Sequence, residues 1–71
     1  MQKFEIIDKL NELKNCKWIT ITRNNHIQVV LYSDIINYEK DEFLFYKLDN
    51  TKFYYKDITA LMPSPLDEAR L

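Results

Sequence analysis

The stretch Lys52-Phe53-Tyr54-Tyr55-Lys56 combines aromatic residues with lysines, a combination that suits the binding of single-stranded nucleic acid. In an extended strand, Lys52, Tyr54 and Lys56 share one face, and Phe53 and Tyr55 share the other. An aromatic ring stacks on a base, worth about 1–3 kcal/mol, and a lysine neutralises phosphate. The alternative is a half-buried strand with Phe53 and Tyr55 in the core and a solvated polar face. Lys52, Tyr54 and Lys56 are therefore candidate nucleic-acid or nucleotide ligands.

A second candidate group, Asn24, Asn25 and His26, lies in a predicted turn. These polar side chains extend the candidate nucleic-acid or nucleotide site, with an ordinary polar turn as the alternative. His26 has no acid or nucleophile beside it in the sequence, so we expect no acid–base chemistry there. Lys47 belongs to the strand predicted to face Lys52, where it would enlarge the basic patch.

An acidic cluster and a tryptophan form an alternative, protein-binding site. Glu39, Asp41 and Glu42 can imitate phosphates and engage a basic partner. Trp18 opens a predicted strand and is of the type found in cores and interfaces. The acidic oxygens also suit Mg²⁺ or Ca²⁺, but a run of charges in a turn is typical of a solvated loop. We therefore predict no metal site there.

Several chemistries are excluded by composition. The chain has no glycine, which removes every glycine-rich loop that cradles phosphates. One histidine and one cysteine cannot build a cysteine- or histidine-rich zinc site within a single chain. No nucleophile–base pair is visible, so we expect neither catalysis nor a cofactor. The net charge of −1 does not indicate a strongly basic nucleic-acid binder.

Size and cysteine usage predict one small domain over residues 1–71. The 71 residues are 46% hydrophobic, enough for a core, yet a domain this small is marginal alone. The single cysteine, Cys16, forms no internal disulfide, so oligomerisation is the expected source of extra stability. A reduced cysteine suits the cytoplasm, and no apolar run is long enough for a membrane span.

The elements that must position these residues follow from hydrophobic periodicity. Residues 2–15 predict a helix with an apolar stripe of Phe4, Ile7, Leu10 and Leu13, widened by Ile6. Strands are predicted between residues 17 and 62, and the Arg23-Asn24-Asn25-His26 turn requires an asparagine at positive φ. The predicted strands are 18–22, 27–32 with a bent continuation to 38, 43–48, 52–55 and 57–62.

Residues 63–71 predict a short helical tail, since Ser64 suits an N-cap and Pro65 suits the first helical position. The whole pattern predicts a mainly β fold with an N-terminal α-helix. We expect a small bent antiparallel sheet or barrel of four to five strands, of the Sm-like or SH3-like kind.

This order resembles the Sm-like fold, and distantly the bacterial RNA chaperone Hfq family. Residues 10–14, Leu-Asn-Glu-Leu-Lys, are similar to a stretch of that family's N-terminal helix, and the Asn24-Asn25 turn to its first hairpin. Residues 53–59, running on to Pro63, are similar to its last two strands. Lys56 stands where the family has a histidine, and Ile6 where it has a uridine-binding glutamine. The resemblance covers residues 4–63 and implies an oligomer that binds RNA.

Two functions are therefore expected. The first is a non-catalytic Sm-like homo-oligomer that binds RNA or nucleotides. The alternative is a protein-interaction module encoded by a phage or plasmid, which inhibits a host protein system or sequesters a nucleotide. The abundance of isoleucine, asparagine and lysine without glycine indicates an AT-rich genome and favours a mobile element. An RNA binder would depend on Lys52 and Lys56, and an acidic inhibitor on Glu39, Asp41 and Glu42.

Overall fold

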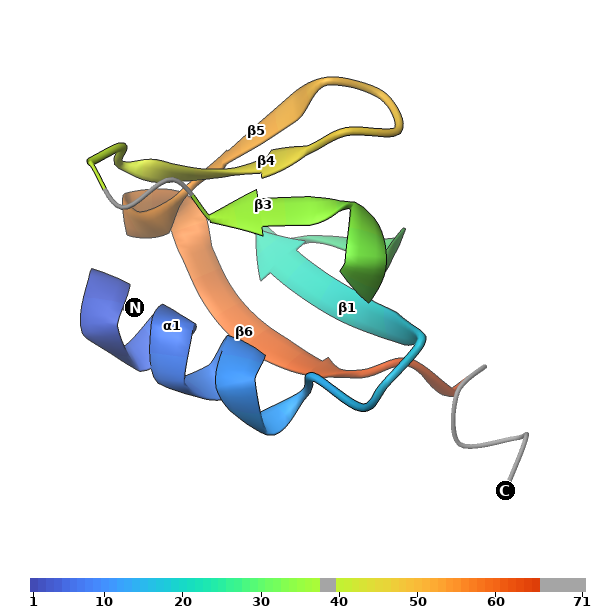
Figure 1. Ribbon diagram of the computed structural model, residues 1–71. Helices are drawn as coiled ribbons and strands as arrows, with labels where there is room; N and C mark the ends of the chain where they lie inside the picture. The colour runs from blue at the N-terminus through green and yellow to red at the C-terminus, as the bar shows by residue number, and fades with distance from the viewer. Residues whose placement is uncertain (38–39, 66–71) are drawn as a thin grey trace.

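The computed structural model describes residues 1–37 and 40–65, and it has the predicted class: mainly β with an N-terminal helix (Figure 1). Two antiparallel sheets of three strands each follow the helix. The elements in chain order are α1 (Lys3–Glu12), β1 (Trp18–Arg23), β2 (His26–Leu31), the 3-10 turn η1 (Tyr32–Asp34), β3 (Ile35–Asn37), β4 (Phe43–Tyr46), β5 (Thr51–Tyr54), the 3-10 turn η2 (Tyr55–Asp57) and β6 (Ile58–Pro63).

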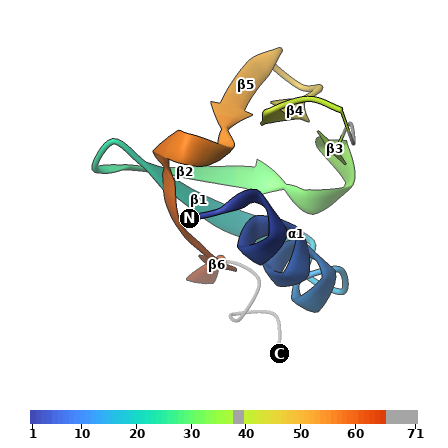
Figure 2. The same ribbon diagram turned by 90° about the vertical axis from the view of Figure 1, so that its left-hand side faces the viewer.

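The two sheets are joined by a bend at η1. This bend divides one predicted strand into two, so the structure has six strands where four to five were predicted. One sheet has the order β2-β1-β6 and the other β3-β4-β5. The predicted long second strand is divided by η1 into β2 and β3. Backbone bonds continue the pairing on both sides, from Tyr32 N–H to Lys17 C=O and from Lys47 N–H to Asp34 C=O. The chain therefore forms one meander folded over itself, with β6 returning to β1 (Figure 2).

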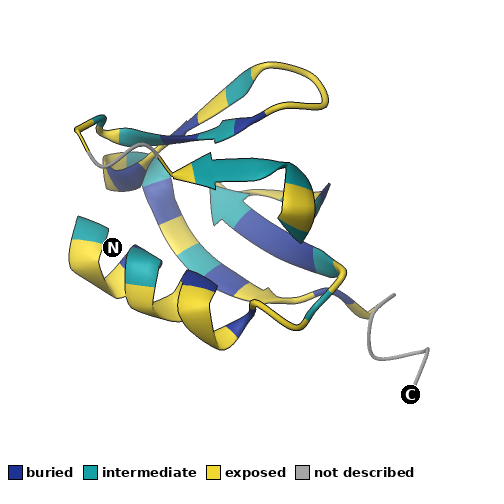
Figure 3. Cartoon of the chain, viewed as in Figure 1, coloured by how far each residue is buried: buried dark blue, intermediate teal, exposed yellow. Residues whose placement is uncertain are grey.

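The core fills the space between the folded sheets and α1. Buried residues follow one another along β1, whereas in β5 the buried Phe53 lies between exposed neighbours, as in a strand with one face covered (Figure 3). The buried hydrophobic residues are Ile6, Leu10, Leu13, Ile19, Ile21, Val30, Leu44, Tyr46, Phe53, Tyr55, Ile58 and Leu61.

The helix is shorter than predicted, and part of its predicted apolar stripe is buried while Phe4 is not. Its buried positions are Ile6, Leu10 and Leu13, spaced i, i+4 and i+7, whereas Phe4 is 63% exposed. Phe4 stands about 200° around the helix from Ile6, since successive residues turn by 100°. The helix ends at Glu12, with Leu13 as its C-cap, and the chain beyond it makes i to i−3 bonds, from Lys14 N–H to Asn11 C=O and from Cys16 N–H to Leu13 C=O. The expected end at Asn15 was wrong.

The predicted tail falls largely outside the described residues. Pro63, expected to begin the tail, is the last residue of β6 instead. The Ser64 N–H donates to the Trp18 C=O at 3.1 Å, so the pairing with β1 continues past Pro63. The remaining tail residues, 66–71, lie outside the described part of the chain.

The β1–β2 turn confirms the role predicted for its asparagines. Asn24 and Asn25 have φ values of 48° and 65°, and Arg23 pairs with His26 across a two-residue loop. Positive φ at both loop residues matches the right-handed twist of the flanking strands. Asparagine replaces the missing glycine because its short polar side chain tolerates this left-handed conformation.

Substitutions at Asn25 test this account. We expect Asn25→Ala to lower the free energy of unfolding by about 1 kcal/mol, because alanine does not tolerate positive φ as asparagine does. Asn25→Gly is expected to preserve or raise that free energy. Urea denaturation followed by circular dichroism measures both, with Asn11→Ala on the exposed side of α1 as the control. An alanine variant as stable as the glycine variant would contradict the claim that position 25 requires a residue that tolerates positive φ.

Candidate nucleic-acid interface

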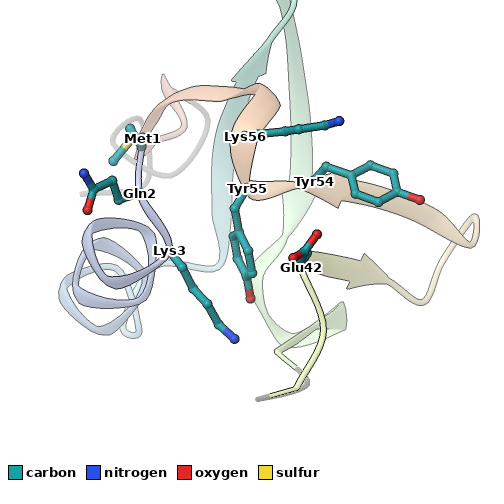
Figure 4. Close-up of a pocket in the computed structure, with 7 residues that line it drawn as sticks. All are labelled: Met1, Gln2, Lys3, Glu42, Tyr54, Tyr55 and Lys56. Carbon is teal, nitrogen blue, oxygen red and sulfur yellow. The ribbon is translucent and has the colours of Figure 1, made fainter.

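A pocket lies between the start of α1 and the η2 turn, and it brings Tyr54 and Lys56 together with three N-terminal residues (Figure 4). Its volume is about 400 Å³, within the range of small-ligand sites. The lining residues are Met1, Gln2, Lys3, Glu42, Tyr54, Tyr55 and Lys56. We call this hollow the Tyr54 pocket.

The predicted alternation of side chains in this region is confirmed. Lys52, Tyr54 and Lys56 are exposed, whereas Phe53 and Tyr55 are buried. Tyr54 and Lys56 extend in the same direction, and Tyr55 turns inward beside Lys3 (Figure 4). The alternation continues past the end of β5 because Tyr54, the residue before η2, is itself extended, with φ −68° and ψ 134°. The structure therefore leaves an aromatic ring and an ammonium group available side by side.

The inner wall of the pocket is held by Tyr55. Its hydroxyl donates to the Asn37 Oδ1 at 2.8 Å. Burial, with a smaller contribution from the negative charge of Asp41, raises the pKa of the Tyr55 phenol. The Lys3 Nζ lies 5.6 Å from the centre of the Tyr55 ring and donates to the Asp41 C=O at 3.2 Å. The inner wall of the pocket is thus formed by the neutral phenol of Tyr55, with the ammonium group of Lys3 over its ring.

The N-terminal segment is fixed against η2 by backbone contacts. The Met1 nitrogen donates to the Ile58 C=O at 2.8 Å, just after η2. The Gln2 N–H donates to the Glu5 Oε1 at 3.2 Å, a local bond at the start of α1. These contacts place Gln2 and Lys3 at the mouth of the Tyr54 pocket, which sequence reasoning did not foresee.

The outer face of the β4–β5 hairpin continues the aromatic and basic surface. Phe43 pairs with Tyr54 in the register, and their ring centres are 5.5 Å apart in an edge-to-face arrangement. The Lys52 Nζ lies 5.1 Å from the centre of the Phe43 ring. Lys47 was predicted to belong to the strand that faces Lys52, but β4 ends at Tyr46. The residue of β4 opposite Lys52 is Phe45.

The turn candidates line a different hollow. Asn24 and His26 border it together with Arg23, Ile27 and Gln28, and no lining residue is shared with the Tyr54 pocket.

Arg23, which the sequence did not single out, connects β1 to β5. Its guanidinium carbon lies 4.5 Å from the centre of the Phe53 ring, and its Nη1 donates to the Lys52 C=O at 3.0 Å.

The alternative protein-binding residues are not gathered in one place. Asp41 and Glu42 precede β4, and Glu42 lines the Tyr54 pocket, while Trp18 begins β1 in the other sheet. Glu39 lies outside the described residues. A surface that the sequence did not reveal is the outer face of the β2-β1-β6 sheet, where Ile27, Val29 and Met62 are 69%, 41% and 52% exposed. The register places Trp18 on the same face.

No protein-family model, curated protein or solved structure matches this chain. Within residues 1–37 and 40–65, no group of three or more histidine, cysteine, aspartate or glutamate side chains is arranged to hold a metal ion. In the same part of the chain, no helix has the length and apolar character needed to cross a membrane.

Proposed function

We propose that this protein is a non-catalytic, Sm-like homo-oligomer of the cytoplasm that binds single-stranded RNA at the Tyr54 pocket. The observation that carries the proposal is the exposed Tyr54 ring beside Lys56, in a pocket of about 400 Å³ that Lys3 also lines. A base stacks on the tyrosine, and the ammonium groups neutralise the adjacent phosphate. The strand order, a bent meander that returns to β1, supports the Sm-like part of the proposal.

The positions of β5 and β6 at the edges of their sheets support oligomerisation. The Tyr55 N–H donates to the Glu42 C=O, so Tyr55 and Glu42 form a hydrogen-bonded pair of the β4–β5 ladder. Hydrogen-bonded and non-hydrogen-bonded pairs alternate, and the backbone N–H and C=O of Tyr54 therefore point away from β4. In the described part of the chain, β5 and β6 each have one neighbouring strand. Pairing of β5 with β6 of a second copy joins two different edges, and contacts of this kind form a ring when the rotation between copies closes.

Solution mass and RNA titration test the proposal together. We expect light scattering to give a multimer of the 8.6 kDa chain, and fluorescence anisotropy to show binding of a labelled single-stranded RNA. With two lysines per site, the slope of log K against log salt should be about −1.4. A concentration-independent monomer would refute the oligomer. An absence of RNA binding at low salt would refute the RNA function.

A second function, protein binding, is favoured by one observation. The outer face of the β2-β1-β6 sheet exposes Ile27 and Val29 on β2 and Met62 on β6, and exposed apolar surface marks interaction sites. In that case the chain is an interaction module of a phage or plasmid, and this sheet face contacts the partner. A Val29→Lys substitution would abolish partner binding in that case and leave RNA binding unchanged.

A further inference from the structure

The outer face of the β4–β5 hairpin carries a second cation at a defined distance from the Tyr54 ring. Lys52 and Tyr54 are two residues apart on the same face of β5, which corresponds to about 6.6 Å along a strand. Lys56 follows Tyr54 by two residues on the other side. Along this face, Tyr54 therefore lies between two lysine residues.

The position of Lys52 is restrained by its neighbours. Its Nζ lies over the Phe43 ring, 5.1 Å from the centre, and Phe43 in turn contacts Tyr54 edge to face. Its backbone carbonyl accepts the hydrogen bond from Arg23. Among the residues that the structure describes, no carboxylate forms an ion pair with the Lys52 ammonium.

The order lysine, aromatic ring, lysine corresponds to the order phosphate, base, phosphate in a nucleic-acid chain. A nucleotide inside a chain has a phosphate on each side of its sugar, so a base stacked between two cations presents a phosphate to each. A free nucleoside 5′-monophosphate has one phosphate group and satisfies one of the two lysines. A base-paired duplex keeps its bases in the helical stack and offers none to Tyr54.

We propose, on the basis of the function proposed above, that the site recognises an internal nucleotide of a single-stranded RNA and not a free nucleotide. Tyr54 stacks on the base, Lys56 binds the phosphate on one side, and Lys52, held over Phe43, binds the phosphate on the other side. The strand therefore crosses from the Tyr54 pocket onto the outer face of the β4–β5 hairpin. This assignment separates RNA binding from nucleotide sequestration.

The test compares ligands with one and two phosphates around the same base. Calorimetric titration would measure uridine 5′-monophosphate, uridine 3′,5′-bisphosphate and a uridine trinucleotide, together with the corresponding adenosine and deoxy compounds. We expect the bisphosphate to bind about three- to tenfold more tightly than the monophosphate, as one added phosphate contact predicts. Lys52→Gln should remove this advantage, so that the monophosphate and the bisphosphate bind with similar affinity.

Lys47→Gln is the matched control, because Lys47 is an exposed lysine of the same hairpin but lies in its turn. It should retain the wild-type preference for the bisphosphate. Equal binding of monophosphate and bisphosphate by the wild-type protein would overturn the inference while the Tyr54 site stands. Failure of every ligand to bind would overturn the proposed function itself.

Discussion

Replacing Tyr54 with alanine is expected to weaken the binding of single-stranded RNA by about tenfold or more, since stacking of one base on an aromatic ring is worth about 1–3 kcal/mol. The side chain is 39% exposed, so a large part of the ring is available to a base. The change also removes the edge-to-face contact with Phe43, which costs about 1 kcal/mol of folding stability. Fluorescence anisotropy with a labelled RNA measures the first effect, and urea denaturation the second.

Tyr54→Phe is the control for this prediction. Phenylalanine keeps the ring and loses only the hydroxyl, so RNA affinity should stay within about twofold of wild type, because stacking uses the face of the ring. An alanine variant that binds RNA as tightly as wild type would exclude Tyr54 as the stacking residue. Equal losses in the alanine and phenylalanine variants would show that the hydroxyl, and not the ring, makes the important contact.

Replacing Phe53 with alanine should have the largest effect on folding. Phe53 is fully buried and contacts the Tyr46 ring, with centres 6.4 Å apart, and the Arg23 guanidinium. Removing a buried phenylalanine costs about 3–5 kcal/mol. A chain of 71 residues has a total stability of about 4–10 kcal/mol. We therefore expect the Phe53→Ala protein to be partly or largely unfolded at 25 °C.

The same substitution at Phe4 provides the matched control, because Phe4 is a phenylalanine at an exposed position of α1. Phe4→Ala should change the free energy of unfolding by less than about 0.5 kcal/mol. Circular dichroism with urea compares the two variants directly. If Phe4→Ala were the more damaging of the two, the orientation of α1 described above would be wrong.

Local sequence patterns predicted the elements well. The β-branched run from Trp18 to Thr22 specifies β1 without help from distant residues, and Asn24 and Asn25 specify the turn after it through their tolerance of positive φ. The helix was predicted from its period. Leu10 and Leu13 of the predicted stripe are buried. The choice between Phe4 and Ile6 was not predictable, because both are apolar and it depends on where the sheet lies.

The part of the candidate site that lies on β5 was predictable from the sequence, whereas the residues that reach it from α1 and β1 were not. Alternation within one strand was enough to place Lys52 and Tyr54 on the exposed face and Phe53 in the core. Gln2 and Lys3 enter the same pocket through a contact between residues 57 positions apart, from Met1 to Ile58. Arg23 reaches β5 through a side chain that crosses from one sheet to the other. Such contacts follow from the closed tertiary structure and have no local pattern.

The return of β6 to β1 has a consequence for the order of folding. The β1–β2 hairpin and the β3-β4-β5 meander join residues close in the chain, whereas Arg23 of β1 pairs with Ile58 of β6, about half the chain length away. Closure of long loops is slow because their entropy is lost before the contacts form. The β1–β6 pairing therefore belongs to the late steps of folding. Since β6 also anchors Met1 at the Tyr54 pocket, the pocket is completed only when the slowest part of the chain has closed.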